Sequence, residues 1–125
     1  MAGVLILGGR SDIGGEIARR VAPGKDIVLA ARGTHGMDGR EQQLRAAGAR
    51  SVHLLDFDAA DFPSHAGVVD RAIELAGPLE IAVVAFGILG DQERAERDAS
   101  HAVDIAKIDY AAQISLLTLV SERMQ

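Results

Sequence analysis

The chain has no cysteine and no tryptophan, and only one tyrosine and three prolines among its 125 residues. The absence of cysteine excludes disulfides, thiolate metal sites and cysteine nucleophiles, and it agrees with a reducing compartment. Acidic residues outnumber basic ones, giving a net charge of −5, and the basic residues are scattered. A protein that binds nucleic acid carries a basic patch, so the sequence predicts no nucleic-acid partner.

Long apolar runs are also missing. The longest uncharged apolar run, residues 81–90, is much shorter than the roughly 18 residues of a membrane-spanning helix. No basic segment or cleavage site typical of a signal peptide precedes the first apolar run at residues 4–7. With 48% hydrophobic and 25% charged residues, the composition is that of one globular domain over residues 1–125. We therefore expect a soluble, cytoplasmic, single-domain protein.

What the sequence does contain is an alternation of strand and helix patterns. Continuous apolar runs, typical of strands buried on both faces of a parallel sheet, alternate with apolar residues at helical spacing. The predicted strands are residues 4–7, 27–31, 51–55 and 79–86; the predicted helices begin near residues 13, 38, 64 and 100, with a short exposed helix at 91–98. This order predicts an α/β fold with a doubly wound parallel sheet. Because the six-stranded form of that fold needs a second half, we interpret the chain as its truncated N-terminal part.

The same patterns predict which helix faces are buried and where the helices begin and end. Asp38 and Ser64 are residue types that cap helix N-termini, and Gly48 stands where a left-handed residue ends a helix. The first helix has one apolar stripe, which we expect to pack on the sheet: Ile13, Ile17 and Val21. The third helix has an apolar side made of Val68, Val69, Ala72, Ile73 and Ala76. The histidines lack the spacing of metal ligands, so we expect no metal and place them on the surface or in loops: His35, His53, His65 and His101.

A glycine-rich segment, GGRSDIGG at residues 8–15, joins the first strand to the first helix. Such a turn presents backbone N–H groups and a positive helix end to a phosphate. A P-loop needs lysine and a hydroxyl after this glycine spacing, whereas glycine and glutamate follow here. A hydrolase elbow would use Ser11, but branched Ile13 stands where that turn needs a small residue. A dinucleotide loop fits better, although the step from Gly8 to Gly14 departs from G-x-G-x-x-G; a structural turn without ligand stays open.

The ends of the other strands bear on this choice, because open parallel sheets bind ligands beyond the carboxyl ends of their strands. Arg32 ends the second strand, where an arginine would pair with the 2′-phosphate of NADP and a carboxylate would bind the ribose of NAD. Arg10, inside the turn, is a candidate for a second clamp. Asp56 and Phe57 end the third strand. The alternatives are solvated side chains for both arginines and a helix cap or solvated acid for Asp56.

The turn resembles the T-G-x-x-x-G-I-G segment of the short-chain dehydrogenases/reductases. Gly8 and Gly14 match the outer glycines, while Asp12 replaces the middle one and a leucine replaces the threonine. The resemblance implies a Rossmann fold that binds NADP(H), with Asp56 accepting a hydrogen bond from the adenine amine. The cofactor-binding residues that it implies are Gly8, Arg10, Ser11, Asp12, Ile13, Gly14, Arg32, Asp56, Phe57, Ala85, Phe86 and Gly87.

The chain resembles one branch of the family in particular, the actinobacterial reductases of decaprenylphosphoryl-2-keto-erythro-pentose. The resemblance lies in segments 8–14, 56–59 and 85–91. This implies reduction by NADPH of the 2-keto group of a lipid-linked pentose, in cell-wall arabinan synthesis, by a homo-oligomer associated with the membrane through its substrate. The family's serine and Tyr-x-x-x-Lys fall beyond residue 125. Asp109 stands at the family's catalytic asparagine, with a helix-surface acid as the alternative. A non-catalytic NADP-binding module is the alternative for the whole chain.

Overall fold

The computed structural model describes residues 2–9, 12–85 and 98–124, and the side chains of all of these except residues 105–109. Four parallel strands form one sheet in the order β3-β2-β1-β4. They are β1 (Gly3–Leu7), β2 (Asp26–Ala31), β3 (Ser51–Asp56) and β4 (Leu79–Val84). The chain builds outward from β1 to β3 and then crosses over to β4 on the other side of β1. The predicted doubly wound parallel sheet is therefore confirmed.

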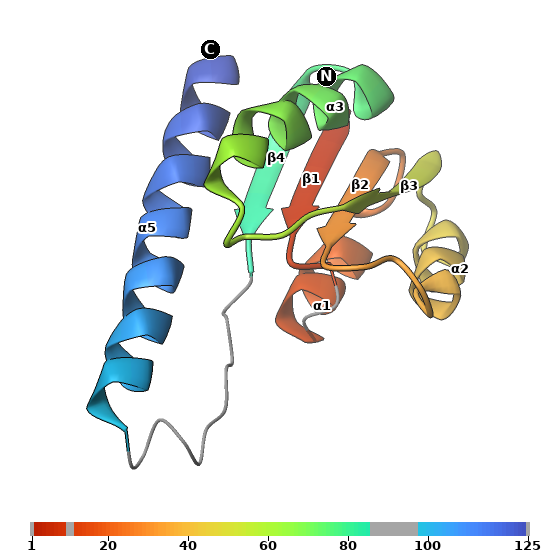
Figure 1. Ribbon diagram of the computed structural model, residues 1–125. Helices are drawn as coiled ribbons and strands as arrows, with labels where there is room; N and C mark the ends of the chain where they lie inside the picture. The colour runs from red at the N-terminus through yellow and green to blue at the C-terminus, as the bar shows by residue number, and fades with distance from the viewer. Residues whose placement is uncertain (1, 10–11, 86–97, 125) are drawn as a thin grey trace.

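Helices cover both faces of this sheet (Figure 1). On one face lie α1 (Asp12–Val21) and α2 (Asp38–Ala46), and on the other lie α3 (His65–Ala76) and α5 (Ala99–Arg123). A 3-10 turn, η1 (Phe62–Ser64), leads into α3. The long helix α5 begins beyond the carboxyl ends of the strands and runs back beside α3 and β4. Among the described residues, no helix is long and apolar enough to cross a bilayer.

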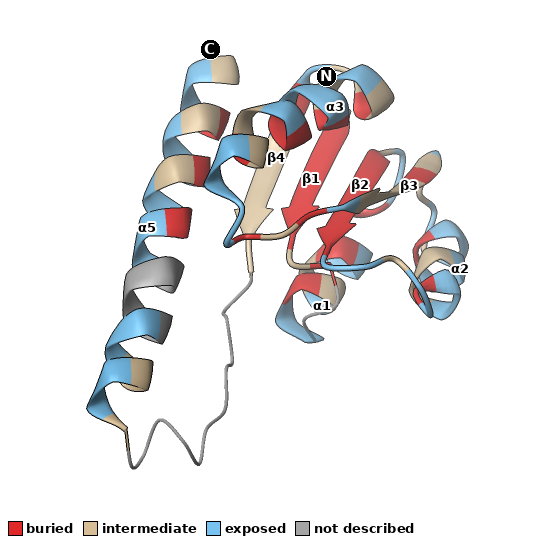
Figure 2. Ribbon diagram, in the orientation of Figure 1, coloured by how far each residue is buried: buried red, intermediate tan, exposed pale blue. Residues whose placement is uncertain are grey.

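The strands divide the apolar residues between two cores. In β1, Leu5 and Leu7 belong to the core under α3 and α5, whereas Val4 and Ile6 belong to the core under α1 and α2. All four are fully buried. Figure 2 shows β1 and β2 buried along their length and β4 only half-buried. This burial on both faces explains why the sequences of the central strands are unbroken apolar runs.

Several predicted helix features are confirmed. The apolar side of α3 is buried at Val68, Val69, Ala72 and Ala76, with Ile73 half-buried beside it. The helix ends at Gly77, whose φ is +77°. Gly48, just after α2, has a φ of +103°, as a left-handed C-terminal residue requires.

The predicted stripe of α1 is only partly confirmed: Ile17 and Val21 are half-buried, and Val21 packs against the core under α1 and α2, but Ile13 does not. Ile13 is 71% exposed, and the buried residues of the helix are Gly14 and Ala18. The row that faces the sheet is therefore displaced by one position from the stripe of large side chains. The helix leaves β1 through a short turn and lies close to the sheet, so small residues fit at the contact. Apolar spacing alone gives the period of a helix but not which row of residues lies closest to its neighbour.

Both predicted N-caps also need correction. Asp38 is the first residue of α2, whose N-cap is Met37, so its carboxylate interacts with the helix dipole in the first turn and does not cap. Ser64 does occupy the N-cap of α3, but its hydroxyl donates to the carbonyl of Asp61 at 2.7 Å. The cap that the structure shows is Asp98, whose carboxylate accepts from Ser100 and His101 at the start of α5. The rest of the predicted helix at 91–98 lies outside the described residues.

His65 contradicts the expectation that the histidines lie on the surface, because it is completely buried. Its Nε2 lies 2.9 Å from the carbonyl oxygen of Ala59, and its Nδ1 lies 2.8 Å from the Ser115 hydroxyl. Since a carbonyl only accepts, Nε2 carries the proton and Nδ1 accepts from Ser115. His65 thus ties the segment after β3 to α3 and α5, and its position one helical turn before Val68 was the signal that it faces the core.

Candidate functional site

The carboxyl ends of the four strands are joined by backbone hydrogen bonds into one continuous edge. At β4, the Ala85 N–H donates to the carbonyl of Leu7, at the end of β1 (2.8 Å). At β2, the carbonyl of Ala30 accepts from the glycine turn. At β3, the Phe57 N–H donates to the carbonyl of Ala31 (2.9 Å). These bonds bring the candidate residues that follow each strand to the same edge, at the place where the chain crosses from one side of β1 to the other.

The glycine turn is pressed against β2 where it leaves β1. The N–H groups of Gly8 and Gly9 both donate to the carbonyl of Ala30, at 2.8 and 3.0 Å, and Gly8 has a φ of +103°. A side chain at Gly9 would begin 2.9 Å from the Cβ of Leu29, closer than real contacts allow. Gly9 is therefore required for packing against β2, and its own N–H is already used within the protein.

Gly14 fixes the other side of the turn, in the first part of α1. A Cβ there would lie 2.8 Å from the carbonyl oxygen of Gly8 and 3.3 Å from the Cβ of Ala85. The absence of a side chain therefore lets the start of α1 approach both the turn and the end of β4. Asp12, the first residue of the helix, is fully exposed, and so is most of Ile13. The N-terminus of α1, the positive end of its dipole, thus opens onto the carboxyl edge of the sheet.

Asp56 acts on the loop that follows β2. Its Oδ1 accepts a hydrogen bond of 2.7 Å from the N–H of Gly33, which has a φ of +71°. Arg32, immediately before Gly33, is exposed and makes no hydrogen bond or ion pair with the described part of the chain. The carboxylate at the end of β3 thereby fixes the backbone beside this arginine. The predicted residues Arg32 and Asp56 are brought to neighbouring positions.

Other predicted site residues are placed differently. The Phe57 side chain is 4% exposed and packs in the core, 5.8 Å from the ring of His65, so it offers the edge its backbone alone. Ala85 is half-buried beside Gly14. Asp109 lies in α5, and its side chain is outside the described part. Four further predicted residues also lie outside the described ranges: Arg10, Ser11, Phe86 and Gly87.

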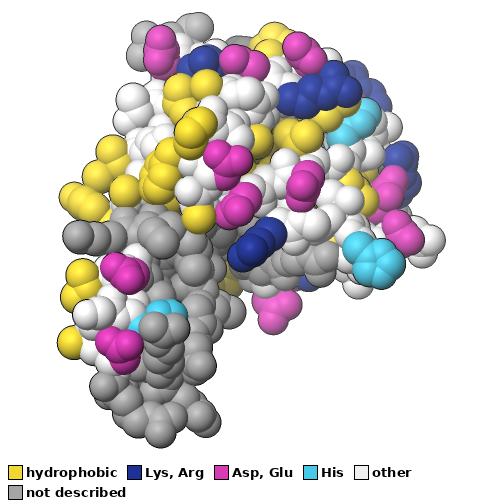
Figure 3. All heavy atoms as spheres, viewed as in Figure 1, with side chains coloured by type: hydrophobic (Ala, Val, Ile, Leu, Met, Phe, Trp, Pro, Cys, Tyr) yellow, Lys and Arg dark blue, Asp and Glu magenta, His cyan; other side chains and the backbone are white. Residues whose placement is uncertain are grey.

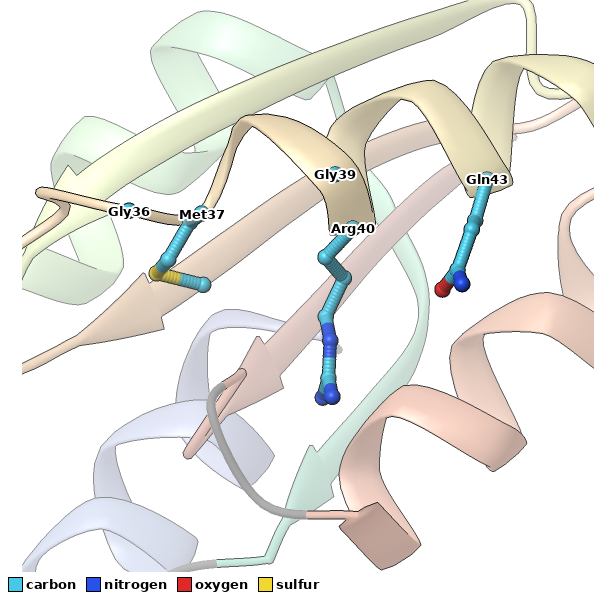
Figure 4. A pocket seen from close by; sticks show the side chains of 5 residues that line it. All are labelled: Gly36, Met37, Gly39, Arg40 and Gln43. Carbon is cyan, nitrogen blue, oxygen red and sulfur yellow. The ribbon is translucent and has the colours of Figure 1, made fainter.

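Arg40 is a site residue that the sequence reasoning missed. It projects from the first turn of α2 toward α1 and the end of β1, on the same side of the helix as Met37 and Gln43 (Figure 4). Its Nη1 donates a hydrogen bond of 2.7 Å to the carbonyl of Gly9. Together with Gly36 and Gly39, these side chains line a hollow beside the glycine turn. Spacing held a signal, because Arg40 precedes the buried Leu44 by one helical turn.

Within the described ranges, the groups at this edge are suited to binding a ligand. The edge combines a glycine turn, an open helix N-terminus, an exposed guanidinium and a fixed carboxylate. The open helix N-terminus suits an anion, the guanidinium suits a phosphate, and the carboxylate suits an amine. A doubly wound sheet with this set of groups at its topological switch point defines the class of dinucleotide-binding α/β folds.

The comparisons with known proteins narrow this class. The family model of the short chain dehydrogenases matches residues 2–125. An uncharacterized oxidoreductase of Mycobacterium tuberculosis is 52% identical over 124 residues, covering 99% of this chain and 50% of that protein. An uncharacterized oxidoreductase in the mprA 5′ region of Streptomyces coelicolor is 36% identical over 98% of this chain and 49% of that protein. The chain belongs to the short-chain dehydrogenase family, and it spans about half the length of the curated relatives it matches.

Solved structures agree with the fold. A short-chain dehydrogenase from Oenococcus oeni superposes with a TM-score of 0.86 at 19% identity, covering 98% of this chain and 56% of that one. The F189W actinorhodin polyketide ketoreductase, solved with NADPH, has a TM-score of 0.78 at 27% identity, over 94% of this chain and 45% of that one. The predicted family membership and Rossmann-like fold are thus confirmed. A particular closeness to the decaprenylphosphoryl pentose reductases is not shown by these matches.

Proposed function

We propose that this chain is the cofactor-binding part of an NADPH-dependent short-chain reductase. The observation that carries the proposal is that the glycine turn after β1, Arg32 after β2 and Asp56 at the end of β3 follow neighbouring strands of one parallel sheet. Their common edge includes the switch point beside β1, which is where open α/β sheets bind ligands. The ketoreductase solved with NADPH, at 27% identity, supports the same choice of ligand.

The residues present fit the parts of a dinucleotide. The pyrophosphate would lie at the N-terminus of α1, and Arg32 would hold the 2′-phosphate through its planar pair of donors. Asp56 uses Oδ1 for Gly33, and its Oδ2 makes no hydrogen bond within the described ranges, so it can accept from the adenine amine. Ile13, 71% exposed beside the turn, is an apolar side chain that the bound dinucleotide would cover. By resemblance, the set is completed by Gly8, Arg10, Ser11, Asp12, Gly14, Phe57, Ala85, Phe86 and Gly87.

For the whole protein we propose reduction of a ketone, for which bound NADPH supplies the hydride. Residues 1–125 contain no Tyr-x-x-x-Lys, because the single tyrosine, Tyr110, is followed four positions later by Ile114. Asp109 is proposed, by resemblance alone, at the family's asparagine position. The resemblance also makes the 2-keto group of a decaprenylphosphoryl pentose the first substrate to test, against small-molecule ketones, in a cytoplasmic enzyme. A non-catalytic NADP-binding module would bind NADPH and turn over none of these.

The same resemblance supports a homo-oligomer formed through α5. Hydrophobic side chains gather over this helix on the face shown in Figure 3. At least half of the side chain is exposed at four large apolar residues of α5: Val103, Tyr110, Ile114 and Leu117. A monomeric protein rarely leaves so many in one helix uncovered. Sedimentation velocity of the full-length protein tests this, and a monomer at all concentrations would refute it.

The cofactor assignment is tested by replacing Arg32 with alanine in the full-length protein. Dissociation constants for NADPH and NADH are measured by fluorescence titration. Loss of a charge-assisted phosphate contact should weaken NADPH binding by about 10-fold or more, while NADH, which has no 2′-phosphate, stays within about twofold. The control is Arg71→Ala, because Arg71 is also an exposed arginine but pairs with Glu74 on α3. An unchanged preference for NADPH in Arg32→Ala would show that the assignment is wrong.

A further inference from the structure

Arg40 makes a contact with the glycine turn that goes beyond helix packing. Its Nη1 donates to the carbonyl of Gly9 at 2.7 Å, and 23% of its side chain is exposed, so this charge-assisted bond is partly shielded from water. The N–H of the same Gly9 is already held by Ala30, at 3.0 Å. Both backbone polar groups of Gly9 are therefore fixed, one by β2 and one by α2. The orientation of the Gly9 backbone is thus set from two elements, β2 and α2.

Gly15 provides the room for this guanidinium. A Cβ at Gly15 would lie 2.2 Å from Nη1 of Arg40 and 2.6 Å from its Cζ. The guanidinium thus rests directly on the backbone of α1 at a position where any side chain would displace it. Because that Cβ would point at Arg40, a residue added there would enter the space between α1 and α2. This is a reason for glycine at position 15 that the dinucleotide motif itself does not supply.

The positive charge of Arg40 also lies near Asp12, the one acidic residue of segment 8–15. Asp12 stands at the N-terminus of α1, where a bound pyrophosphate would lie, and a carboxylate there repels an anion. Nη2 of Arg40 lies 3.9 Å from Oδ1 of Asp12. The Asp12 side chain is fully exposed, so this ion pair adds little to folding stability. Its consequence is a local one: the guanidinium offsets the negative charge at the helix end that faces the ligand.

We propose that Arg40 is a positioning residue of the dinucleotide site, which holds the carbonyl of Gly9 and offsets the charge of Asp12. The inference rests on the proposed binding of a nicotinamide dinucleotide. It gives Arg40 a different role from Arg32. Arg32 would read the 2′-phosphate and so choose between cofactors, whereas Arg40 acts on the turn and on the charge near the pyrophosphate, which both cofactors share. Removing Arg40 should therefore weaken NADPH and NADH by the same factor.

The test measures dissociation constants for NADPH and NADH, together with thermal unfolding, in the full-length protein. Arg40→Gln should weaken both cofactors by about 10-fold, as expected for one charge-assisted hydrogen bond. Adding Asp12→Gly to Arg40→Gln should recover about threefold of that loss, because the uncompensated carboxylate is gone. The matched control is Arg45→Gln, since Arg45 also leaves α2 to reach a carboxylate, Glu41, and a backbone carbonyl, that of Val52, away from the turn. It should bind both cofactors as the wild type does.

Gly15→Ala supplies an independent measurement that does not remove the arginine. Alanine favours a helix over glycine by about 1 kcal/mol, so the unfolding temperature should not fall. Displacement of the guanidinium should nevertheless weaken both cofactors by about as much as Arg40→Gln does. Wild-type affinity in both Arg40→Gln and Gly15→Ala would overturn the inference, and so would a loss confined to NADPH. If the wild type binds neither cofactor, the proposed function itself fails; wild-type binding with unaffected variants refutes the role of Arg40 alone.

Discussion

The two ends of the sheet use their charged residues in different ways. At the amino end, charged side chains bind each other: Asp26 pairs with Arg50 and Lys25 pairs with Glu80. At the carboxyl end, their short hydrogen bonds go to backbone, and the Arg40–Asp12 ion pair is longer, at 3.9 Å. Arg40 donates to the carbonyl of Gly9, and Asp56 accepts from the N–H of Gly33.

This difference distinguishes a region built for stability from one built for binding. A side-chain pair neutralises both members and leaves little charge for a ligand. A charged group that holds a loop through its backbone keeps its charge, so the same residue can order the loop and attract a ligand. Asp56, which holds the N–H of Gly33 beside the exposed Arg32, is the clearest instance at the carboxyl end. Stability and ligand affinity measured in the same variants separate the two regions.

The largest effects are expected from two crowded glycines, one in each region. In Gly3→Ala, the new Cβ would lie 2.7 Å from the carbonyl oxygen of Pro78, and in Gly9→Ala it would lie 2.9 Å from the Cβ of Leu29. Overpacking of this kind costs about 1–3 kcal/mol, so both variants should be less stable in urea unfolding. Only Gly9→Ala should also weaken NADPH binding, by about 10-fold, because only its displacement moves the glycine turn.

The pair is its own control, since both substitutions add one methyl group, one at the start of β1 and one in the turn that follows it. Affinities are measured below the unfolding transition of each variant, so that the folded fraction is compared. Equal losses of affinity in the two variants would show that stability and binding are not separated in this way. Wild-type affinity in Gly9→Ala would remove the turn from the binding site.

A smaller effect, confined to stability, is expected for Asp26→Asn at the amino end. Hydrogen bonds from Arg50 and from the Ser51 hydroxyl lower the pKa of Asp26 to about 2. Its pKa in the unfolded chain is about 3.9, so its stabilisation is fully present above that pH and is lost as pH falls toward 2. The substitution should cost about 2 kcal/mol at pH 7 and about half of that near pH 3.

Urea unfolding of the wild type and Asp26→Asn at a series of pH values measures this. The sign of the effect is the decisive part: the two stability curves should converge toward acid. A constant difference from pH 7 to pH 3 would mean that the charge of Asp26 is not what stabilises this end. NADPH affinity at pH 7 should be the same in both proteins.

The sequence carried enough information for the fold and for the positions of the strand ends. Unbroken apolar runs identify β1 and β2 because both strands are buried on both faces. The order of elements then brings Arg32 and Asp56 to one edge. This placement does not depend on the helix faces and caps that were predicted wrongly. What the pattern could not give was the contact row of α1, because Gly14 and Ala18 face the sheet through their small size and not through hydrophobicity.

Arg40 and His65 show a second limit. Each is a polar residue at a helix position that packing turns inward, and residue type alone places it in solvent. His65 is buried because Ala59 and Ser115, 6 and 50 residues away in sequence, satisfy its two nitrogens. Arg40 reaches a carbonyl 31 residues away. Helical spacing indicates that such a residue faces inward, but the groups that it binds follow from the fold and have no local signature.

The smallest effect is expected for Glu80→Gln, which removes the second side-chain pair at the amino end. Lys25 Nζ lies 2.6 Å from Oε2 of Glu80, and this hydrogen bond lowers the pKa of Glu80. With the Glu80 side chain 40% exposed, water and salt screen the pair, so the unfolding temperature should fall by only about 1 °C. In about 1 M salt, where the Debye length is about 3 Å, even this difference should vanish. A larger or salt-independent loss would mean that this pair, like the buried carboxylate of Asp26, holds the amino end through buried contacts and not through exposed charge.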